Sequence, residues 1–239
     1  MGRPQVLRQF SSPDSSSALH EPSAVGTAAD AYWTSFYAGE QRAAVPDEPS
    51  AFARWSATRS GTTTLLVDIG TGTARDALWF SRQGHEILGL DYAAPAIDQA
   101  SRTAARERLS ATFEVFDLYR VDQVRAMGTR LAQRMHPPLL YGRFLIHALQ
   151  DHGRHALWDM AATALQAGGS LYLEFRTGKD AGARHEFGEH FRKFLDADTV
   201  VDEIEDWGGR IEYRHEDHGL APYRDEDPHV CRLVSTWKR

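Results

Sequence analysis

The chain has 239 residues and is mildly acidic, with 27 Lys and Arg against 33 Asp and Glu and a net charge of −6. That length fits one large domain, at roughly 100–200 residues per domain, and a hydrophobic content of 42% is enough for a packed core. The negative charge argues against a protein that holds long nucleic acid by neutralising phosphates. No apolar run reaches the roughly 18 residues of a membrane span, and a single cysteine, Cys231, excludes an internal disulfide. We therefore expect a cytoplasmic monomer or homodimer with no nucleic-acid or membrane partner.

The first 28 residues are rich in Ser and Pro and contain few large apolar side chains. We expect a flexible tail at 1–28, followed by a single domain at 29–239. Four aromatic residues near the start of that domain have the spacing of one helix face: Tyr32, Trp33, Phe36 and Tyr37. We expect them to form a lid within a helical cap at 29–60, with ordinary helix packing as the alternative for two of the four.

From residue 61 onward, short apolar runs alternate with helical segments, which is typical of a doubly wound α/β fold. Five of the runs predict parallel strands: Thr63–Ile69, Glu86–Leu90, Thr112–Phe116, Leu139–Ile146 and Ser170–Phe175. The segments between them predict helices: Arg75–Gln83, Ala94–Arg108, Val121–Met135 and His152–Gln166. In such a sheet a ligand binds beyond the carboxyl ends of the strands.

The last part of the chain predicts two more helices and two more strands. The helices are expected at Asp180–Leu195 and Thr199–Trp207, and the strands at Arg210–His215 and Val230–Trp237. A polar loop joins the two strands, so we expect a terminal antiparallel hairpin. The fold class is therefore α/β, with a mostly parallel, seven-stranded Rossmann-like sheet and an N-terminal helical lid.

The turn after the first strand contains two closely spaced glycines and reads Asp68-Ile69-Gly70-Thr71-Gly72-Thr73-Ala74. Glycines let the backbone approach a ligand closely, although a Gly-x-Gly turn alone is as often structural. A dinucleotide-binding turn needs a small residue where Arg75 stands, and Asp68 would repel a pyrophosphate. Asp68 instead favours a cationic ligand. S-adenosylmethionine is such a ligand, because it carries a sulfonium and an ammonium group and no phosphate.

The stretch Leu65–Asp98 resembles the cofactor half of class I S-adenosylmethionine-dependent methyltransferases. Within them it is most similar to the small-molecule branch of thiopurine- and tellurite-type enzymes. The family pattern is an acidic residue, Gly-x-Gly-x-Gly, and a second acidic residue at the end of the next strand. Asp68, Gly70 and Gly72 fit this pattern, and Ala74 replaces the third glycine. The resemblance covers roughly residues 62–176.

The resemblance implies that 61–176 is the cofactor-binding core and 177–239 the substrate side. Asp91 ends the second strand, and its two oxygens can accept both ribose hydroxyls. Asp117 matches the family position that binds the adenine amino group, with a turn or helix-cap residue as the alternative. The full expected cofactor set is Asp68, Gly70, Thr71, Gly72, Ala74, Asp91, Tyr92, Asp117, Leu118, Tyr32, Trp33 and Tyr37.

The ends of the fourth and fifth strands are where the methyl group would face an acceptor. His147 at the end of the fourth strand is a candidate general base, with packing beside the cofactor as the alternative. Arg143, inside a strand expected to be buried, requires an anionic partner, either a protein carboxylate or a ligand carboxylate. Arg176 ends the fifth strand and opens the most basic stretch of the chain. That stretch predicts either an anionic acceptor or a solvated helix face.

Five residues are expected on the acceptor side: Phe36, Arg184, His185, Tyr223 and Arg224. We expect no catalytic metal, because His185 lacks a second histidine at metal-binding spacing and Arg176-Thr177 stands where metal-dependent relatives have an Asp-Asn pair. The expected function is methyl transfer from S-adenosylmethionine to a small biosynthetic acceptor, preferentially at oxygen. The alternatives are an NAD(P)- or flavin-dependent oxidoreductase and a non-catalytic domain that binds S-adenosylmethionine.

Overall fold

The computed structural model describes residues 32–39, 45–61, 65–181 and 193–237. The expected tail at 1–28 lies outside these residues, as do Arg184 and His185. Residues 32–38 are helical, and we call residues 32–39 the lid segment.

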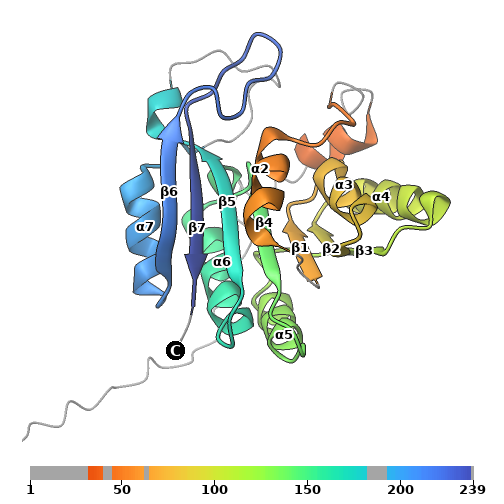
Figure 1. Cartoon of the computed structure of the whole chain (residues 1–239), viewed down its shortest axis with the longest axis horizontal. Helices are drawn as coiled ribbons and strands as arrows, with labels where there is room; N and C mark the ends of the chain where they lie inside the picture. The colour runs from red at the N-terminus through yellow and green to blue at the C-terminus, as the bar shows by residue number, and fades with distance from the viewer. Residues whose placement is uncertain (1–31, 40–44, 62–64, 182–192, 238–239) are drawn as a thin grey trace, which may run out of the picture.

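One seven-stranded sheet forms the centre of the structure, in the order β3-β2-β1-β4-β5-β7-β6 (Figure 1). The strands are β1 (Leu65–Ile69), β2 (Glu86–Asp91), β3 (Ala111–Val115), β4 (Leu139–Arg143), β5 (Ser170–Arg176), β6 (Arg210–Asp217) and β7 (Val230–Thr236). The first five are parallel to one another, and β7 runs antiparallel between β5 and β6. The α/β class, the seven strands and the terminal antiparallel hairpin are therefore confirmed.

Helices cover both faces of the sheet, as the apolar positions of each helix require. On one face pack α2 (Ala51–Ser60), α3 (Arg75–Arg82) and α4 (Ala94–Glu107). On the other face pack α5 (Val121–Ala132), α6 (Asp151–Ala164) and α7 (Ala197–Asp206). Because both faces are covered, strands such as β1 and β5 are almost entirely buried.

The end of the fourth strand differs from the prediction. It was expected to run from Leu139 to Ile146, but β4 ends at Arg143, and Ile146–Ala148 forms a short 3₁₀ helix, η2. Phe144 adopts a left-handed φ of 55°, which turns the chain out of the strand. Arg143 is therefore the last residue of the strand, and His147 lies in η2.

The helix expected at Asp180–Leu195 is wrong at both of its described ends. Gly178–Asp180 forms a single 3₁₀ turn, η3, and Leu195 forms a parallel β-bridge with Thr177. That bridge fixes an extended backbone where the apolar spacing predicted a helix. The intervening residues 182–192 lie outside the described part of the chain.

Candidate active site

A cavity of about 420 Å³ lies at the carboxyl ends of the parallel strands. It is bounded by the lid segment and by part of the β6–β7 loop (residues 218–229). The predicted residues that line it are Trp33, Phe36, Tyr37, Asp68, Gly70, Thr71, Gly72, Asp91, Tyr92, Asp117, Leu118, Arg143, His147, Arg176 and Tyr223. Three others do not line it: Tyr32, Ala74 and Arg224.

Hydrogen bonds to the neighbouring strand shape the glycine turn. The N–H groups of Gly70 and Thr71 both donate to the carbonyl of Leu90, at 2.7 and 3.0 Å. Gly72 has a φ of 53°, and a Cβ added to it would lie 2.5 Å from the hydroxyl of Tyr37. Glycine is needed here because the lid segment packs against the turn. Ala74, at the family's third glycine, also has a left-handed φ of 58°, so the alanine is held in a strained conformation.

Asp68 is a buried carboxyl group at the edge of the cavity. Its Oδ2 accepts a hydrogen bond of 2.7 Å from the hydroxyl of Thr71. Burial raises the pKa of Asp68 to about 7, with further increases from the charges of Asp76 and Asp91, while the Thr71 hydrogen bond and Arg143 lower it. Burial is the largest of these effects, and it disfavours the charged form of Asp68. A cationic ligand beside Asp68 would stabilise the charged carboxylate and lower this pKa.

Asp91 and Asp117 lie at the same edge of the sheet as Asp68. Asp91 accepts hydrogen bonds of 2.9 Å from the N–H groups of Gly72 and Ala93, one on each carboxylate oxygen. Burial raises the pKa of Asp91, and these backbone hydrogen bonds oppose the increase. Oδ1 of Asp117 accepts from the N–H of Tyr119 at 2.8 Å, so this residue both stabilises a turn and lines the cavity.

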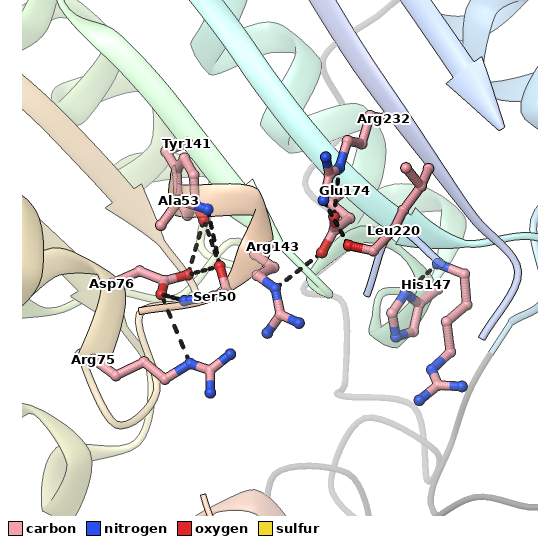
Figure 2. A network of polar contacts seen from close by, with 11 residues as sticks. Ser50, Ala53, Arg75, Asp76, Tyr141, Arg143, His147, Glu174, Leu220 and Arg232 are labelled. Atoms are coloured by element: carbon pink, nitrogen blue, oxygen red, sulfur yellow. Dashed lines mark hydrogen bonds and ion pairs between the residues drawn. The ribbon is translucent and has the colours of Figure 1, made fainter. Parts of the chain in front are cut away.

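A second polar network lies behind the turn and was not predicted from the sequence. Asp76 on α3 accepts hydrogen bonds from the N–H and hydroxyl of Ser50, both at 2.7 Å, and from the hydroxyl of Tyr141 at 2.8 Å. Ser50 also caps α2 by accepting from the N–H of Ala53 at 2.9 Å. Figure 2 shows these residues with Arg75, whose Nε lies 3.7 Å from Asp76. The network joins the start of α2 to α3 and β4.

Arg143 has a protein carboxylate as its partner. Its Nε donates to Oε1 of Glu174 at 2.9 Å, and Arg232 donates to Oε2 of the same residue at 2.8 Å. Glu174 is fully buried, so the carboxylate offsets two neighbouring guanidinium groups (Figure 2). The sequence indicated that Arg143 needs an anionic partner but did not identify it. Glu174 is found only when β4 and β5 are aligned, because the register of these strands places Glu174 opposite Arg143.

His147 and Arg176 are joined through the backbone. The N–H of Arg176 donates to Nδ1 of His147 at 3.2 Å. When the imidazole is neutral, this bond requires the proton on Nε2. The Arg176 side chain donates to Asp180 at 2.6 Å and to Glu226 of the β6–β7 loop at 2.7 Å. Arg176 therefore connects the end of β5 to the loop that closes the cavity.

These residues fit S-adenosylmethionine. Asp68 is a desolvated carboxyl with no cation in hydrogen-bonding contact among the described residues, and Asp91 presents a buried carboxylate at the next strand end. Asp117 and Leu118 line the cavity beyond the third strand. Within the described residues, no three His, Cys, Asp or Glu side chains come together as metal ligands would.

Residues 66–169 match the profile of a family described as "Methyltransferase domain". Residues 66–169 therefore form a methyltransferase domain, with the fold of class I S-adenosylmethionine-dependent methyltransferases. A comparison with curated proteins gave no significant sequence match. Within the described residues, none of the methyltransferase's helices has the length and apolar character needed to cross a bilayer.

Solved structures show the same fold for this methyltransferase. One, titled "Conversion of a Disulfide Bond into a Thioacetal Group during Echinomycin Biosynthesis", is 20% identical with a TM-score of 0.62, covering 80% of this chain and 83% of that one. A TehB-like S-adenosylmethionine-dependent methyltransferase from Corynebacterium glutamicum is 21% identical with a TM-score of 0.55, covering 79% and 88%. The glycopeptide N-methyltransferase MtfA in complex with S-adenosylmethionine is 16% identical with a TM-score of 0.58, covering 79% and 94%. At these identities the likeness, including that to the TehB-like enzyme, is one of fold.

Proposed function

We propose that this methyltransferase modifies an oxygen atom of a small biosynthetic acceptor, such as a natural product or a sugar or glycopolymer precursor. The observation that carries the proposal is that one cavity, of about 420 Å³, contains both the glycine turn and the ends of β4 and β5. Small-molecule pockets have volumes of roughly 300–1,000 Å³. The lid segment and the β6–β7 loop bound the cavity, which favours a small acceptor over a macromolecule. Neighbours of similar fold named for echinomycin biosynthesis and for glycopeptide methylation support a natural-product acceptor.

Two arginines of the cavity wall support an oxygen acceptor. Arg75 and Arg143 line the cavity with guanidinium groups, whereas the guanidinium of Arg176 is paired with Asp180 and Glu226. Arg75 and Arg143 would stabilise an ionised oxygen, such as a phenolate or a carboxylate. When bound, S-adenosylmethionine supplies a methyl group on a positively charged sulfur, which leaves as a neutral thioether. An ionised oxygen can accept that methyl group without a protein base.

We infer that His147 positions the end of β5 and is not the general base. A base needs a lone pair directed at the acceptor proton, whereas Nδ1 of His147 accepts from the backbone of Arg176. For a phenol or a carboxylic acid, the nearby arginines would favour the ionised form, so proton loss to water precedes transfer. Arg143 acts on the acceptor's charge and orientation in this proposal, while Arg176, paired with Asp180 and Glu226, holds the β6–β7 loop beside the acceptor.

The test is a panel of small acceptors that present phenol, carboxylate, sugar hydroxyl or amine groups. Each is incubated with the protein and S-adenosylmethionine, and methylated products are identified by mass spectrometry. Asp91→Ala serves as the background control because it lacks the ribose ligand. Transfer to oxygen-bearing members supports the proposal. Transfer only to amines, or to no member of the panel, contradicts it.

A further inference from the structure

Two arginine side chains reach into the same part of the cavity from different elements. Arg75 is the first residue of α3, and Arg143 is the last residue of β4. Figure 2 shows both guanidinium groups directed into the open space beyond Asp76 and Glu174. Burial, and after it the charge of Arg143, lower the pKa of Arg75, as expected for like charges held close together. An anion placed between them would offset this repulsion.

Arg143 is fixed from behind, which leaves its outer nitrogens available. Its Nε donates to Glu174, and its guanidinium carbon lies 4.1 Å from the centre of the Phe144 ring. Both oxygens of Glu174 are used, because the second accepts from Arg232. Among the described residues, no protein atom accepts a hydrogen bond from Nη1 or Nη2 of Arg143. The side chain is only 20% exposed, so these donors face the cavity and not bulk water.

Arg75 is still less satisfied. Its Nε lies 3.7 Å from Asp76, beyond hydrogen-bonding distance. Asp76 instead accepts from the neutral groups of Ser50 and Tyr141. The Arg75 side chain, 16% exposed, thus has no hydrogen-bond acceptor in the described part of the chain. Two guanidinium groups with unused donors in one cavity make a site for a planar anion.

We propose that Arg75 and Arg143 bind a carboxylate group of the acceptor, so that the substrate of this methyltransferase is a small carboxylic acid. This inference rests on the proposed function and names its substrate class. A guanidinium group forms two parallel hydrogen bonds with a carboxylate, and its planar fork matches that geometry. S-adenosylmethionine also has a carboxylate, so the test must separate the donor from the acceptor.

The experiment uses benzoate as the probe and benzamide as its neutral counterpart. Both are titrated calorimetrically into the full-length protein saturated with S-adenosylhomocysteine, whose own carboxylate then occupies its site. Benzoate is expected to bind, and benzamide to bind at least ~10-fold more weakly, because charge-assisted hydrogen bonds are lost. Arg75→Gln and Arg143→Gln are each expected to weaken benzoate at least ~10-fold while the affinity for S-adenosylhomocysteine stays within about threefold.

Two further variants keep the test sharp. Arg143→Lys keeps the charge but loses the planar fork, so an intermediate loss of benzoate affinity is expected even if a glutamine variant folds poorly. Arg134→Gln is the matched control, because it removes an arginine whose ion pair with Glu86 lies on the surface. Benzoate affinity in Arg134→Gln should equal that of the unmodified protein.

The inference is overturned if benzoate binds no better than benzamide, or if neither Gln variant weakens it. It is also overturned if benzoate binds only in the absence of S-adenosylhomocysteine and both glutamine variants weaken the binding of S-adenosylhomocysteine. That result would mean that Arg75 and Arg143 bind the carboxylate of the methyl donor. These results are separate from failure of the proposed function. Oxygen methylation of neutral acceptors without a benzoate site would overturn only this inference, whereas a benzoate site without oxygen methylation would overturn only the proposed function.

Discussion

The hydroxyl oxygen of Thr71 lies 2.7 Å from Oδ2 of Asp68 and donates a hydrogen bond to it. This bond favours the charged carboxylate, but burial outweighs it and raises the pKa of Asp68 to about 7. Near neutral pH the carboxyl group is therefore close to half protonated in the ligand-free protein. A cationic group bound beside it would lower the pKa again.

Binding of S-adenosylhomocysteine, which carries an ammonium group, should therefore depend on pH through Asp68. Its affinity is expected to rise between about pH 6 and pH 8, by at most about tenfold per pH unit below pH 7. Calorimetry at several pH values measures this dependence. Asp68→Asn should bind more weakly and lose the dependence in this range. Affinity of the unmodified protein that does not change with pH would contradict the ammonium-binding role of Asp68.

The stability of the ligand-free protein should show the opposite trend. The folded-state pKa of Asp68, about 7, exceeds its ordinary value of 3.8, so the folded protein binds more protons between these values. Its contribution to the free energy of unfolding is complete below pH 4 and is lost as the pH rises to about 7, by up to roughly 4 kcal/mol. Urea denaturation of the unmodified protein and of Asp68→Asn isolates this contribution. Equal pH dependence in both would refute it.

Asp91 is expected to contribute strongly to cofactor affinity. We propose that Asp91 accepts both ribose hydroxyls; replacing it with alanine would leave them and the N–H of Gly72 without that acceptor and weaken binding by more than ~1.5 kcal/mol. Asp98→Ala, on the exposed side of α4, is the control and should bind normally. The dissociation constant for S-adenosylhomocysteine is the measurement. An unchanged constant in Asp91→Ala would mean that the ribose is held elsewhere.

Two variants of His147 distinguish a role in positioning Arg176 from a role as the general base. His147→Asn can still present an acceptor to the N–H of Arg176, so its kcat should stay within about tenfold of normal and its pH–rate profile should keep its shape. His147→Ala loses that hydrogen bond and should raise KM. If instead both variants lower kcat by ~10²-fold or more and flatten the acidic limb, His147 is the general base after all.

Glu174 should matter for stability more than any surface carboxylate. Glu174→Gln removes the shared partner of Arg143 and Arg232 and should lower the free energy of unfolding by about 3–5 kcal/mol. Glu107→Gln, which breaks a partly exposed pair with Arg82, should cost less than about 1 kcal/mol. Urea denaturation compares the two. If both variants lose a similarly small free energy of unfolding, the ion pairs of Glu174 with Arg143 and Arg232 do not stabilise the fold more than a surface pair does.

The acidic edge of the site was predictable because parallel strands end together. Asp91 and Asp117 could each be placed from a short apolar run followed by an acid, and Asp68 from its position two residues before the first glycine; all three line one cavity. The three runs have strong strand patterns, so small errors in their predicted boundaries did not change the expected location of the three aspartates. The glycine turn followed from the same reasoning.

The arginine side of the site was harder to predict. Phe144 adopts a left-handed backbone conformation that is rare for an aromatic residue, and this ends β4 at Arg143. The apolar pattern does not reveal this turn, so the strand was predicted to continue to Ile146. Glu174 is separated by 31 residues from Arg143 and by 58 from Arg232, and only the sheet register brings them together. Asp76 likewise pairs with Ser50 across 26 residues. Such pairings depend on tertiary structure and leave no local signature.

The position of β7 also has a consequence for how the protein is made. Within the sheet, β6 pairs only with β7, which is later in the sequence and lies between β5 and β6. During synthesis, β6 therefore has no neighbouring strand to pair with until β7 has been made. The glycine turn and its acids can assemble first, so the nascent chain should form that side of the cavity before the side bounded by the β6–β7 loop.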